Sequence, residues 1–252
     1  MGGSPAESPK DVADKSDVII TSLPSIDAFQ SVMTGADSIK DANKDGLIVI
    51  ECSTLPIKEK QSAHDVLADT GKILLDCPIS GTGAQAANKD LSIYVSGDQK
   101  ASEKCHDIFN GFANLNFYVG EFGNGSKMKF VANHLVHIHN VASAEAMVLG
   151  MKSGLDPHLI FDVISTSAAT SRMFQVRGKM MADANYDDVG MSNRLYQKDL
   201  DIITSFASDV HCPVNLFAAS VQPYRATIDQ GLAEKDTAAV CAVLEDQGRV
   251  KR

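Results

Sequence analysis

A lysine and an asparagine four residues apart are the side chains of this sequence best suited to acid–base chemistry. Lys129 and Asn133 lie in residues 123–133 (GNGSKMKFVAN), where a glycine-rich turn leads into a helical pattern. Residues with this spacing share one face of a helix. Burial and neighbouring charges can bring a lysine pKa toward working pH, so the pair could transfer a proton and orient a substrate. For an isolated pair, a solvated surface lysine is the commoner explanation.

Small hydroxylated residues and glycines follow three of the predicted strands. They are Leu23-Pro24-Ser25, Ser53-Thr54-Leu55-Pro56 and Pro78-Ile79-Ser80-Gly81-Thr82-Gly83. Ligands bind at the carboxyl ends of parallel strands in α/β proteins, and hydroxyl and backbone N–H groups can hold a phosphate or a carboxylate. Ordinary turns also favour these residue types. For a single loop of this kind, an ordinary turn is the preferred explanation. For three such loops in succession, an ordinary turn and a ligand-binding site are about equally good explanations.

Residues 81–86 (GTGAQA) formally fit the glycine fingerprint of dinucleotide-binding folds. That fingerprint needs a full helix within a unit of about 30 residues. Here the next strand is expected by Leu91, which leaves room for little more than a turn or two of helix. We therefore interpret this segment as a substrate-binding loop rather than a pyrophosphate site.

Two other polar groups have less specific explanations. His134, His137 and His139 cluster within a helical pattern, and a metal could bind to the first two. No carboxylate lies close to them in sequence, so packing in the core or at an interface is the favoured explanation and no metal site is expected. Lys198-Asp199 is interpreted as a solvated ion pair on a later helix.

The first half of the sequence alternates short apolar runs with helical patterns. Strands are predicted at residues 17–23, 46–52, 72–77, 91–96 and 116–119, and helices at residues 26–34, 57–70 and 101–112. Continuous runs of Ile, Leu and Val are typical of strands that are buried on both faces. The alternation of strand and helix predicts an α/β fold with a mostly parallel sheet.

After Gly123 only helical patterns remain. A long helix is predicted at residues 126–153, ending before Gly154. Asp156-Pro157 has the N-cap and first-position residues that begin a further helix, and helices are also predicted at residues 195–210 and 214–231. We place a domain boundary here, with residues 1–123 forming an α/β domain and residues 124–252 an all-α domain. The polar tail, residues 247–252, is expected to be frayed.

Composition excludes several classes of protein. The chain has 252 residues, enough for a substantial core, and its net charge of -9 argues against a partner of nucleic acid or anionic membrane. No apolar run reaches the roughly 20 residues that a membrane-spanning helix needs. The five cysteines are scattered and include no Cys-x-x-Cys pair, which suits a reducing compartment. The cytoplasm is favoured, and the mitochondrial matrix stays possible.

The order of these motifs resembles that of the β-hydroxyacid dehydrogenase family over nearly the whole chain. The matching segments are Leu23-Pro24, Glu51-Cys52-Ser53-Thr54, Asp76-Cys77-Pro78-Ile79-Ser80-Gly81-Thr82, Gly123 with Gly125, Lys129 and Asn133, and Lys198-Asp199. Three positions differ from the family pattern. Glu51 replaces an aspartate, Thr82 replaces a glycine, and Ala132 replaces the first of two asparagines.

The resemblance implies a partial Rossmann-like parallel sheet, followed by an all-α domain that begins with a long linking helix. It also implies hydride transfer between a small β-hydroxy acid and NAD or NADP, with Lys129 as general acid/base and Asn133 orienting it and holding the substrate. Ser80, Gly81 and Thr82 would bind the substrate carboxylate. The residues implied on the cofactor side are Leu23, Pro24, Ser53, Thr54 and Lys198. A homo-oligomer joined through the helical domain is a further implication.

Family members begin with a strand, a Gly-x-Gly-x-x-Gly turn, a helix and a second strand, whereas this sequence begins at what resembles the next segment. We expect either a start that omits that loop or a family remnant that binds dinucleotide poorly. A non-catalytic protein serving as a dimerisation or binding partner is therefore the alternative function. A metal-dependent hydrolase using His134 and His137 is a weaker third hypothesis.

Overall fold

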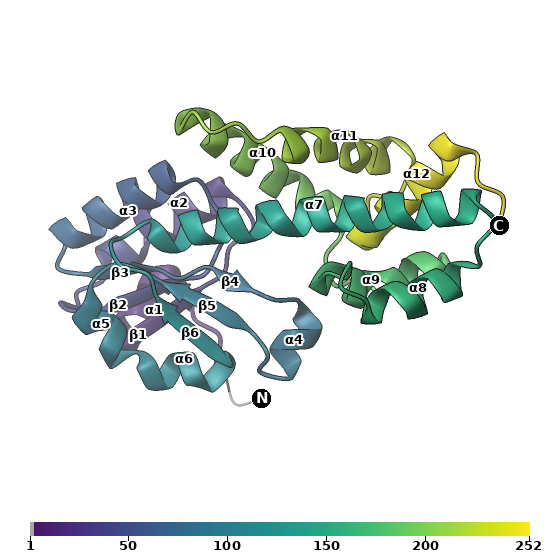
Figure 1. The fold of residues 1–252 in the computed structure, drawn as a ribbon. Helices are drawn as coiled ribbons and strands as arrows, with labels where there is room; N and C mark the ends of the chain where they lie inside the picture. Colours follow the sequence, from purple (N-terminus) through teal and green to yellow (C-terminus); the bar gives the residue numbers. More distant parts are fainter. Residues whose placement is uncertain (1–2) are drawn as a thin grey trace. The chain divides into compact units, whose positions relative to one another are not determined.

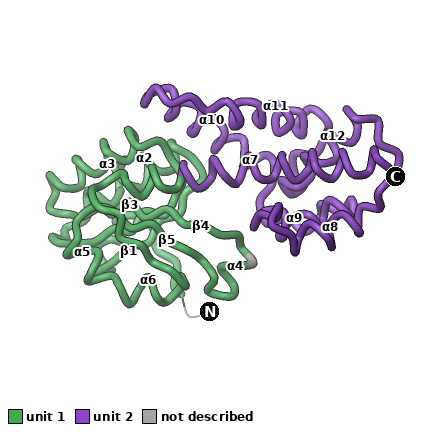
Figure 2. The backbone as a smooth tube through the Cα atoms, in the orientation of Figure 1, with its two compact units in different colours: residues 1–129 green, residues 130–252 purple. Residues whose placement is uncertain are grey.

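The chain divides into two compact units, Met1–Lys129 and Phe130–Arg252 (Figure 2). The computed structural model describes residues 3–252, the side chain of Ala84 excepted. The boundary between the units falls inside helix α7, Asn124–Lys152 (Figure 1). The sequence analysis placed the boundary just before this helix. Because α7 is continuous, its first residues belong to the first unit and the rest to the second.

The first unit contains a three-stranded parallel sheet. Its strands are β1 (Val18–Thr21), β2 (Ile48–Glu51) and β3 (Ile73–Asp76), in the order β1-β2-β3. The register aligns their last residues, because Thr21 pairs with Glu51 and Glu51 pairs with Asp76. The three carboxyl ends therefore lie along one edge of the sheet, and the loops that follow them begin side by side.

A second sheet adds one antiparallel strand pair, whereas the other strand pairs of the described residues are parallel as expected. It contains β4 (Ile79–Ser80), β5 (Ser92–Val95) and β6 (Leu115–Tyr118), and β4 runs antiparallel to β5. β4 continues in the direction of β3, since Asp76 also pairs antiparallel with Ser96, and the chain reverses direction between β4 and β5. Among the described residues, an isolated bridge between Asp76 and Ser96 joins the two sheets. The α/β class itself is confirmed.

Helices cover both faces of the parallel sheet (Figure 1). They are α1 (Pro9–Lys15), α2 (Ile26–Thr34), the 3₁₀ turn η1 (Ile39–Asp41), α3 (Ile57–Asp69), α5 (Gln99–Lys104) and α6 (His106–Phe112), whereas the short α4 (Gly83–Ala87) lies in the connection between β4 and β5. On one face, Val49 and Leu74 pack in a core with α2 and α3 residues such as Phe29. On the other face, Ile50 shares a core with Phe109 of α6. Alternate strand residues thus serve two cores, which explains the continuous apolar runs.

The single helix predicted at residues 101–112 is wrong, because the structure breaks it at Cys105. The backbone of Cys105 has φ −91° and ψ 3°, outside the α-helical region. Its N–H is shared between the carbonyls of Ala101 and Ser102, both at 3.1 Å. A shared bond of this kind marks the end of one helix and lets α6 begin in a new direction.

The second unit is built from helices. After α7 come α8 (Pro157–Thr166), α9 (Arg172–Asp183), α10 (Asn193–Asp209), α11 (Asn215–Asp229), the 3₁₀ turn η2 (Thr237–Ala239) and α12 (Val240–Gly248). Asp156 caps α8 as predicted, accepting hydrogen bonds from the N–H groups of His158 and Leu159. Between residues 119 and 252 the structure contains no strand, only an isolated bridge between Ser192 and Asp236.

The C-terminal tail is tied down, so the prediction of fraying at residues 247–252 is wrong. Arg252 forms an ion pair with Glu245 and donates to the carbonyls of Met181 and Ala182. A guanidinium group with five donors can satisfy several acceptors at once. The last residue therefore links α12 to the end of α9.

Candidate active site

The loops that follow β1 and β2 are joined by a hydrogen bond. The N–H of Leu23 donates to Oγ of Ser53 at 2.7 Å. Ser53 is buried, Leu23 and Thr54 are half-buried, and Pro24 is exposed. The structure thus brings together two of the loops that the sequence analysis assigned to the cofactor, at the carboxyl edge of the parallel sheet.

The predicted substrate loop follows β3 and contains a position that only glycine can fill. Gly81 has φ +141°, and a Cβ atom there would lie 2.5 Å from Cδ2 of Leu91. Ser80 lies in β4, where it pairs with Ser92 rather than standing in an open loop. The N–H of Thr82 donates to Oε1 of Gln85 at 3.0 Å. The Thr82 N–H is therefore already bonded within the loop, to the side chain of Gln85, a residue that was not singled out from the sequence.

Lys129 lies near the beginning of α7 and is only 9% exposed. The alternative of a solvated surface lysine is therefore wrong. The beginning of α7 lies against the strands, because a Cβ atom on Gly125 would be 2.5 Å from the carbonyl oxygen of Asp76 and 2.6 Å from that of Tyr94. A glycine at this position allows the helix backbone to approach the strand ends closely.

Asn133 has a fixed side-chain orientation. Its Nδ2 donates to Oδ2 of Asp199 at 2.8 Å, and both residues are buried. A carboxylate only accepts hydrogen bonds, so the NH₂ group of Asn133 must face Asp199 and its Oδ1 must face the other way. The sequence analysis took Lys198-Asp199 for a solvated pair. The two do approach to 3.3 Å, but Asp199 is buried and serves as an acceptor for Asn133.

Comparison with known proteins decides the family. A profile described as the NAD binding domain of 6-phosphogluconate dehydrogenase matches residues 1–120, and one described as NAD-binding of NADP-dependent 3-hydroxyisobutyrate dehydrogenase matches residues 123–244. An L-threonate dehydrogenase of Cupriavidus necator is 30% identical over 243 residues, covering 96% of this chain and 82% of the relative. The mitochondrial 3-hydroxyisobutyrate dehydrogenase of Rattus norvegicus is 31% identical, covering 98% of this chain and 75% of the relative.

The chain belongs to the β-hydroxyacid dehydrogenase family. It is an NAD(P)-dependent hydroxyacid dehydrogenase acting on a small molecule. The fold agrees: a crystal structure of 3-hydroxyisobutyrate dehydrogenase from Salmonella typhimurium superimposes with a TM-score of 0.84 at 23% identity, covering 94% of this chain and 82% of that one. A 3-hydroxyisobutyrate dehydrogenase of Mycobacterium tuberculosis gives the same TM-score at 24% identity and the same coverage of both chains.

The histidine cluster of this family member packs against aromatic rings. His137 is fully buried and stacks on Tyr196 with 4.0 Å between ring centroids, and His134 stacks on Phe217 at 5.2 Å. Burial lowers the pKa of His134, which favours the neutral ring. Within residues 3–252 no group of three His, Cys, Asp or Glu side chains could hold a metal ion. None of the helices described there is long and apolar enough to cross a membrane.

Two cysteines beside the strand ends are poor nucleophiles. Burial raises the pKa of Cys52 to about 12 and raises the pKa of Cys77 well above its usual value. Because the thiolate is the reactive form, both side chains remain protonated thiols near neutral pH. They fill the core where β2 and β3 end, and the dehydrogenase chemistry must come from other groups.

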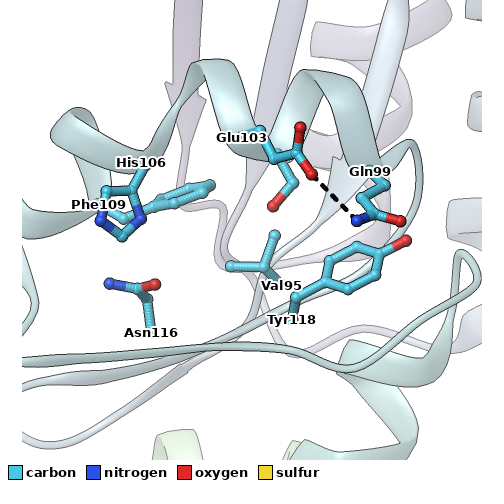
Figure 3. A pocket seen from close by; sticks show the side chains of 8 residues that line it. Val95, Gln99, Glu103, His106, Phe109, Asn116 and Tyr118 are labelled. Atoms are coloured by element: carbon cyan, nitrogen blue, oxygen red, sulfur yellow. Dashed lines mark hydrogen bonds between the residues drawn. The ribbon is translucent and has the colours of Figure 1, made fainter.

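Two cavities of the family member lie away from the predicted residues. One, of about 150 Å³, lies beside β6 in the first unit, where Gln99 donates to Glu103 at 3.0 Å near His106, Asn116 and Tyr118 (Figure 3). The other, of about 320 Å³, lies in the second unit and is lined almost entirely by apolar side chains, including Phe206. None of the predicted catalytic, substrate or cofactor residues lines either cavity.

A buried lysine on α3 was missed. Lys60 is completely buried and contacts two carboxylates, those of Glu51 and Asp76. A signal was present in the sequence, because Lys60 shares the buried stripe of α3 with Ala63 and Leu67, three and seven residues later. A charged residue on the apolar stripe of a helix requires a partner in the core.

Proposed function

We propose that the protein oxidises a small β-hydroxy acid with NAD or NADP, using Lys129 as general acid/base. The observation that carries the proposal is the burial of Lys129 at the beginning of α7, in the same compact unit as Ser80, Gly81 and Thr82. A buried lysine does not contribute a solvated surface charge, so its burial favours a specific role for the ammonium group. Proton transfer by a positioned lysine is the chemistry that the reaction requires.

Lys129 would take the proton from the oxygen of the substrate hydroxyl as a hydride leaves the carbon that bears this hydroxyl, and would return a proton to that oxygen in the reverse direction. When bound, NAD or NADP supplies the hydride acceptor. Asn133 lies one helical turn beyond Lys129, and Asp199 fixes its amide so that its Oδ1 is directed away from that carboxylate. For Asn133 we propose the role of orienting Lys129 and holding the substrate.

The substrate carboxylate would bind at Ser80, Gly81 and Thr82. A hydroxyl group and backbone N–H groups can bind an anion without adding formal charge, which suits a protein of net charge -9. The Gln85 side chain, which accepts the Thr82 N–H, would move aside when the carboxylate arrives. We expect Gln85→Ala to lower the KM for the acid, because that competition is removed.

The residues proposed for the dinucleotide fit its chemistry. Ser53 and Thr54 offer hydroxyl groups for ribose hydroxyls, Leu23 and Pro24 offer apolar surface for the nicotinamide side, and Lys198 offers a positive charge for the dinucleotide's phosphates. The bond from Leu23 N–H to Ser53 Oγ supports the fit, because it holds the two strand-end loops together where ligands of α/β proteins bind.

The names of the relatives support a proposal for the substrate class. Proteins similar to this chain are named L-threonate dehydrogenase and 3-hydroxyisobutyrate dehydrogenase, and both substrates pair a carboxylate with a hydroxyl on the β carbon. We propose a short acid of this kind. The five free cysteines support a reducing compartment, and we propose the cytoplasm, with the mitochondrial matrix as the alternative.

Purified protein should reduce NAD or NADP with L-threonate or 3-hydroxyisobutyrate, followed at 340 nm. Lys129→Ala should lower kcat by about 10²–10⁴-fold, the usual contribution of a general acid/base. Lys127→Ala is the matched control, because Lys127 is exposed on the same helix and should leave kcat unchanged. Equal activity of the wild type and the Lys129 variant would refute the assigned role.

A binding function is the second candidate, and exposed apolar side chains of the second unit favour it. Leu149 on α7 is 73% exposed and Leu216 on α11 is 71% exposed. Contiguous exposed apolar patches mark interfaces between protein chains, and these two leucines are the most exposed of the large apolar side chains among the described residues. We propose a homo-oligomer through the helical unit, and sedimentation of the wild type against Leu149→Glu with Leu216→Glu tests it.

A further inference from the structure

One buried ammonium group contacts two strand ends and the loop behind one of them. Nζ of Lys60 lies 2.6 Å from Oε2 of Glu51 at the end of β2 and 2.8 Å from Oδ1 of Asp76 at the end of β3. It also donates to the carbonyl of Ser53 at 2.6 Å. The Glu51 contact is an ion pair between two completely buried side chains. Ser53 in turn accepts the N–H of Leu23, so the three strand-end loops are connected.

Asp76 extends this connection to the helix that carries Lys129. Its Oδ2 accepts the N–H of Ser126 at 2.7 Å, and its Oδ1 accepts the Ser126 hydroxyl at 2.8 Å. The hydroxyl of Ser96 lies 3.4 Å from Oδ2 and itself accepts the N–H of Gly125 at 2.9 Å. Asp76 therefore caps α7 from a distant point in the sequence, satisfying an N–H that the helix itself leaves unbonded.

The beginning of α7 offsets part of the negative charge of the cluster. Glu51 and Asp76 carry two formal negative charges and Lys60 one positive charge, and all three side chains are completely buried. The positive end of the α7 dipole, equivalent to about half an elementary charge, faces Asp76 through Ser126 and offsets about half of the remaining negative charge. Burial disfavours the charged form of Lys60, but the charges of Asp76 and Glu51 outweigh burial, so its pKa is raised and it stays an ammonium.

Stability alone does not account for such a cluster. Replacing a buried ion pair by apolar side chains of similar volume is often neutral or stabilising, because desolvation of the charges offsets their attraction. The cluster instead fixes the position of particular backbone segments. The carboxylate of Asp76 holds Ser126 at the beginning of α7, and the ammonium group of Lys60 holds the carbonyl of Ser53. Lys129 lies three residues beyond Ser126, and Ser80 lies four residues beyond Asp76.

We propose that Lys60 and Asp76 are positioning residues that hold the beginning of α7, and with it Lys129, in register with the strand-end loops. The inference rests on the proposed function, since it assigns these residues to the placement of the general acid/base and of Ser53. Neither residue contacts the reacting atoms in this role. Their effect on the reaction passes through Ser126 on one side and Ser53 on the other.

The first test compares two buried lysines of the same unit. Lys60→Met removes the ammonium group and should lower kcat by about 10²-fold, the loss that misplacement by about 1 Å can cause. It should also raise the KM for the dinucleotide, because Ser53 loses its restraint. Lys72→Met is the control: Lys72 is also buried but lies before β3, where it donates to the carbonyls of Lys40 and Thr70. Lys72→Met should leave both constants within about twofold of wild type.

A milder variant keeps the inference testable if Lys60→Met does not fold. Ser126→Ala removes one hydrogen bond to Asp76 and keeps the helix, so kcat should fall while the KM for the dinucleotide stays constant. Ser143→Ala, another buried serine on α7, should change neither constant. An unchanged kcat in Ser126→Ala overturns the inference, because a purely structural serine would behave like Ser143.

Hydrogen exchange separates this inference from the proposed function. The Ser126 amide proton should exchange more than tenfold faster in Lys60→Met than in Lys72→Met, because Asp76, which accepts this N–H, loses the ammonium group that holds it. If wild type turns over neither L-threonate nor 3-hydroxyisobutyrate with NAD or NADP, the proposed function fails, and exchange alone decides whether the cluster holds α7. If wild type is active but kcat and exchange are equal in the test and control variants, the positioning role is refuted and the proposed function stands.

Discussion

At the scale of single residues, the polar groups that matter in this protein are those whose orientation is fixed by a buried partner. Asn133 and Lys129 were identified from spacing and from resemblance to a family. The partner of Asn133 was not, because Asp199 lies 66 residues further along the chain and looks, in sequence, like half of a surface ion pair. Spacing predicts which residues share a helix face, but it carries no information on partners from other helices.

Removing Asp199 should therefore cost more than removing an exposed acidic residue on the same helix. Asp199→Ala should lower the free energy of unfolding by about 1.5–3 kcal/mol, the range for a hydrogen bond to a charged group, and should lower kcat because Asn133 loses its fixed orientation. Asp201→Ala is the control, since Asp201 pairs with Arg225 in solvent and should cost no more than about 1 kcal/mol. Urea unfolding and initial rates measure both effects. Equal losses in the two variants would contradict the role of Asp199.

Thiol reactivity offers a second test at this scale. Cys212 is exposed, whereas Cys52 and Cys77 are buried with raised pKa values. At pH 8 the Cys52 thiol, with a pKa of about 12, is almost entirely protonated and shielded, so iodoacetamide should label Cys212 and leave the other two unmodified. Mass spectrometry of the folded protein checks this, and unfolding in urea should expose all of them. Early labelling of Cys52 would show that the edge of the sheet opens in solution.

At the scale of elements, the beginning of α7 requires a glycine. A Cβ atom on Gly125 would lie 2.5 Å from the Asp76 carbonyl oxygen, and backbone atoms cannot move aside as a side chain can. We expect Gly125→Ala to lower the free energy of unfolding by about 1–3 kcal/mol through overpacking and to lower kcat by shifting Lys129. Gly111→Ala is the control, because Gly111 lies in α6 with open space around its Cβ position and alanine is the better helix former by up to about 1 kcal/mol.

The order of these two variants in thermal unfolding is the deciding measurement. Gly111→Ala should melt at or above the wild-type temperature and Gly125→Ala below it. A Gly125→Ala protein with wild-type stability and activity would show that the first turn of α7 can shift to make room for a methyl group. The close approach of α7 to β3 and β5 would then not be needed for activity.

The elements that could be predicted from sequence are those with strong periodicity. Residues 18–21, 48–51 and 73–76 form strands inside the predicted apolar runs, and α7 differs from its predicted range by two residues at its start and one at its end. The two-residue strand β4 was hidden in what looked like a loop, because its pairing with β5 depends on contacts across the fold. The break at Cys105 was missed for a similar reason, since residues 101–112 have good helical periodicity on both sides of it.

The residues proposed for the site show the same difference between what a sequence pattern predicts and what only the folded chain reveals. Ser53, Ser80 and Lys129 were singled out because their residue types suit ligand chemistry at strand ends and a helix start. Lys60 and Gln85 were passed over because their roles depend on what they contact: Glu51 and Asp76 for one, the Thr82 N–H for the other. Local pattern finds the groups that can react or bind, whereas the groups that hold them appear only in the folded chain.

At the scale of the whole molecule, the net charge of -9 opposes the binding of an anionic dinucleotide, so measured binding would be strong support for the proposed cofactor site. NAD and NADP are anions, so long-range electrostatics oppose their approach, and any stabilisation must come from a built site. A ligand that binds only the folded state stabilises it by about 2.7 kcal/mol at a concentration of 100 times its Kd.

We expect one of the two dinucleotides to raise the melting temperature in calorimetry, and the one with the larger shift at equal concentration identifies the preferred cofactor. ATP at the same ionic strength is the control for a non-specific polyanion effect. If neither dinucleotide shifts the transition more than ATP does, hydride transfer by this protein is contradicted, and the binding function through the helical unit becomes the better account of the chain.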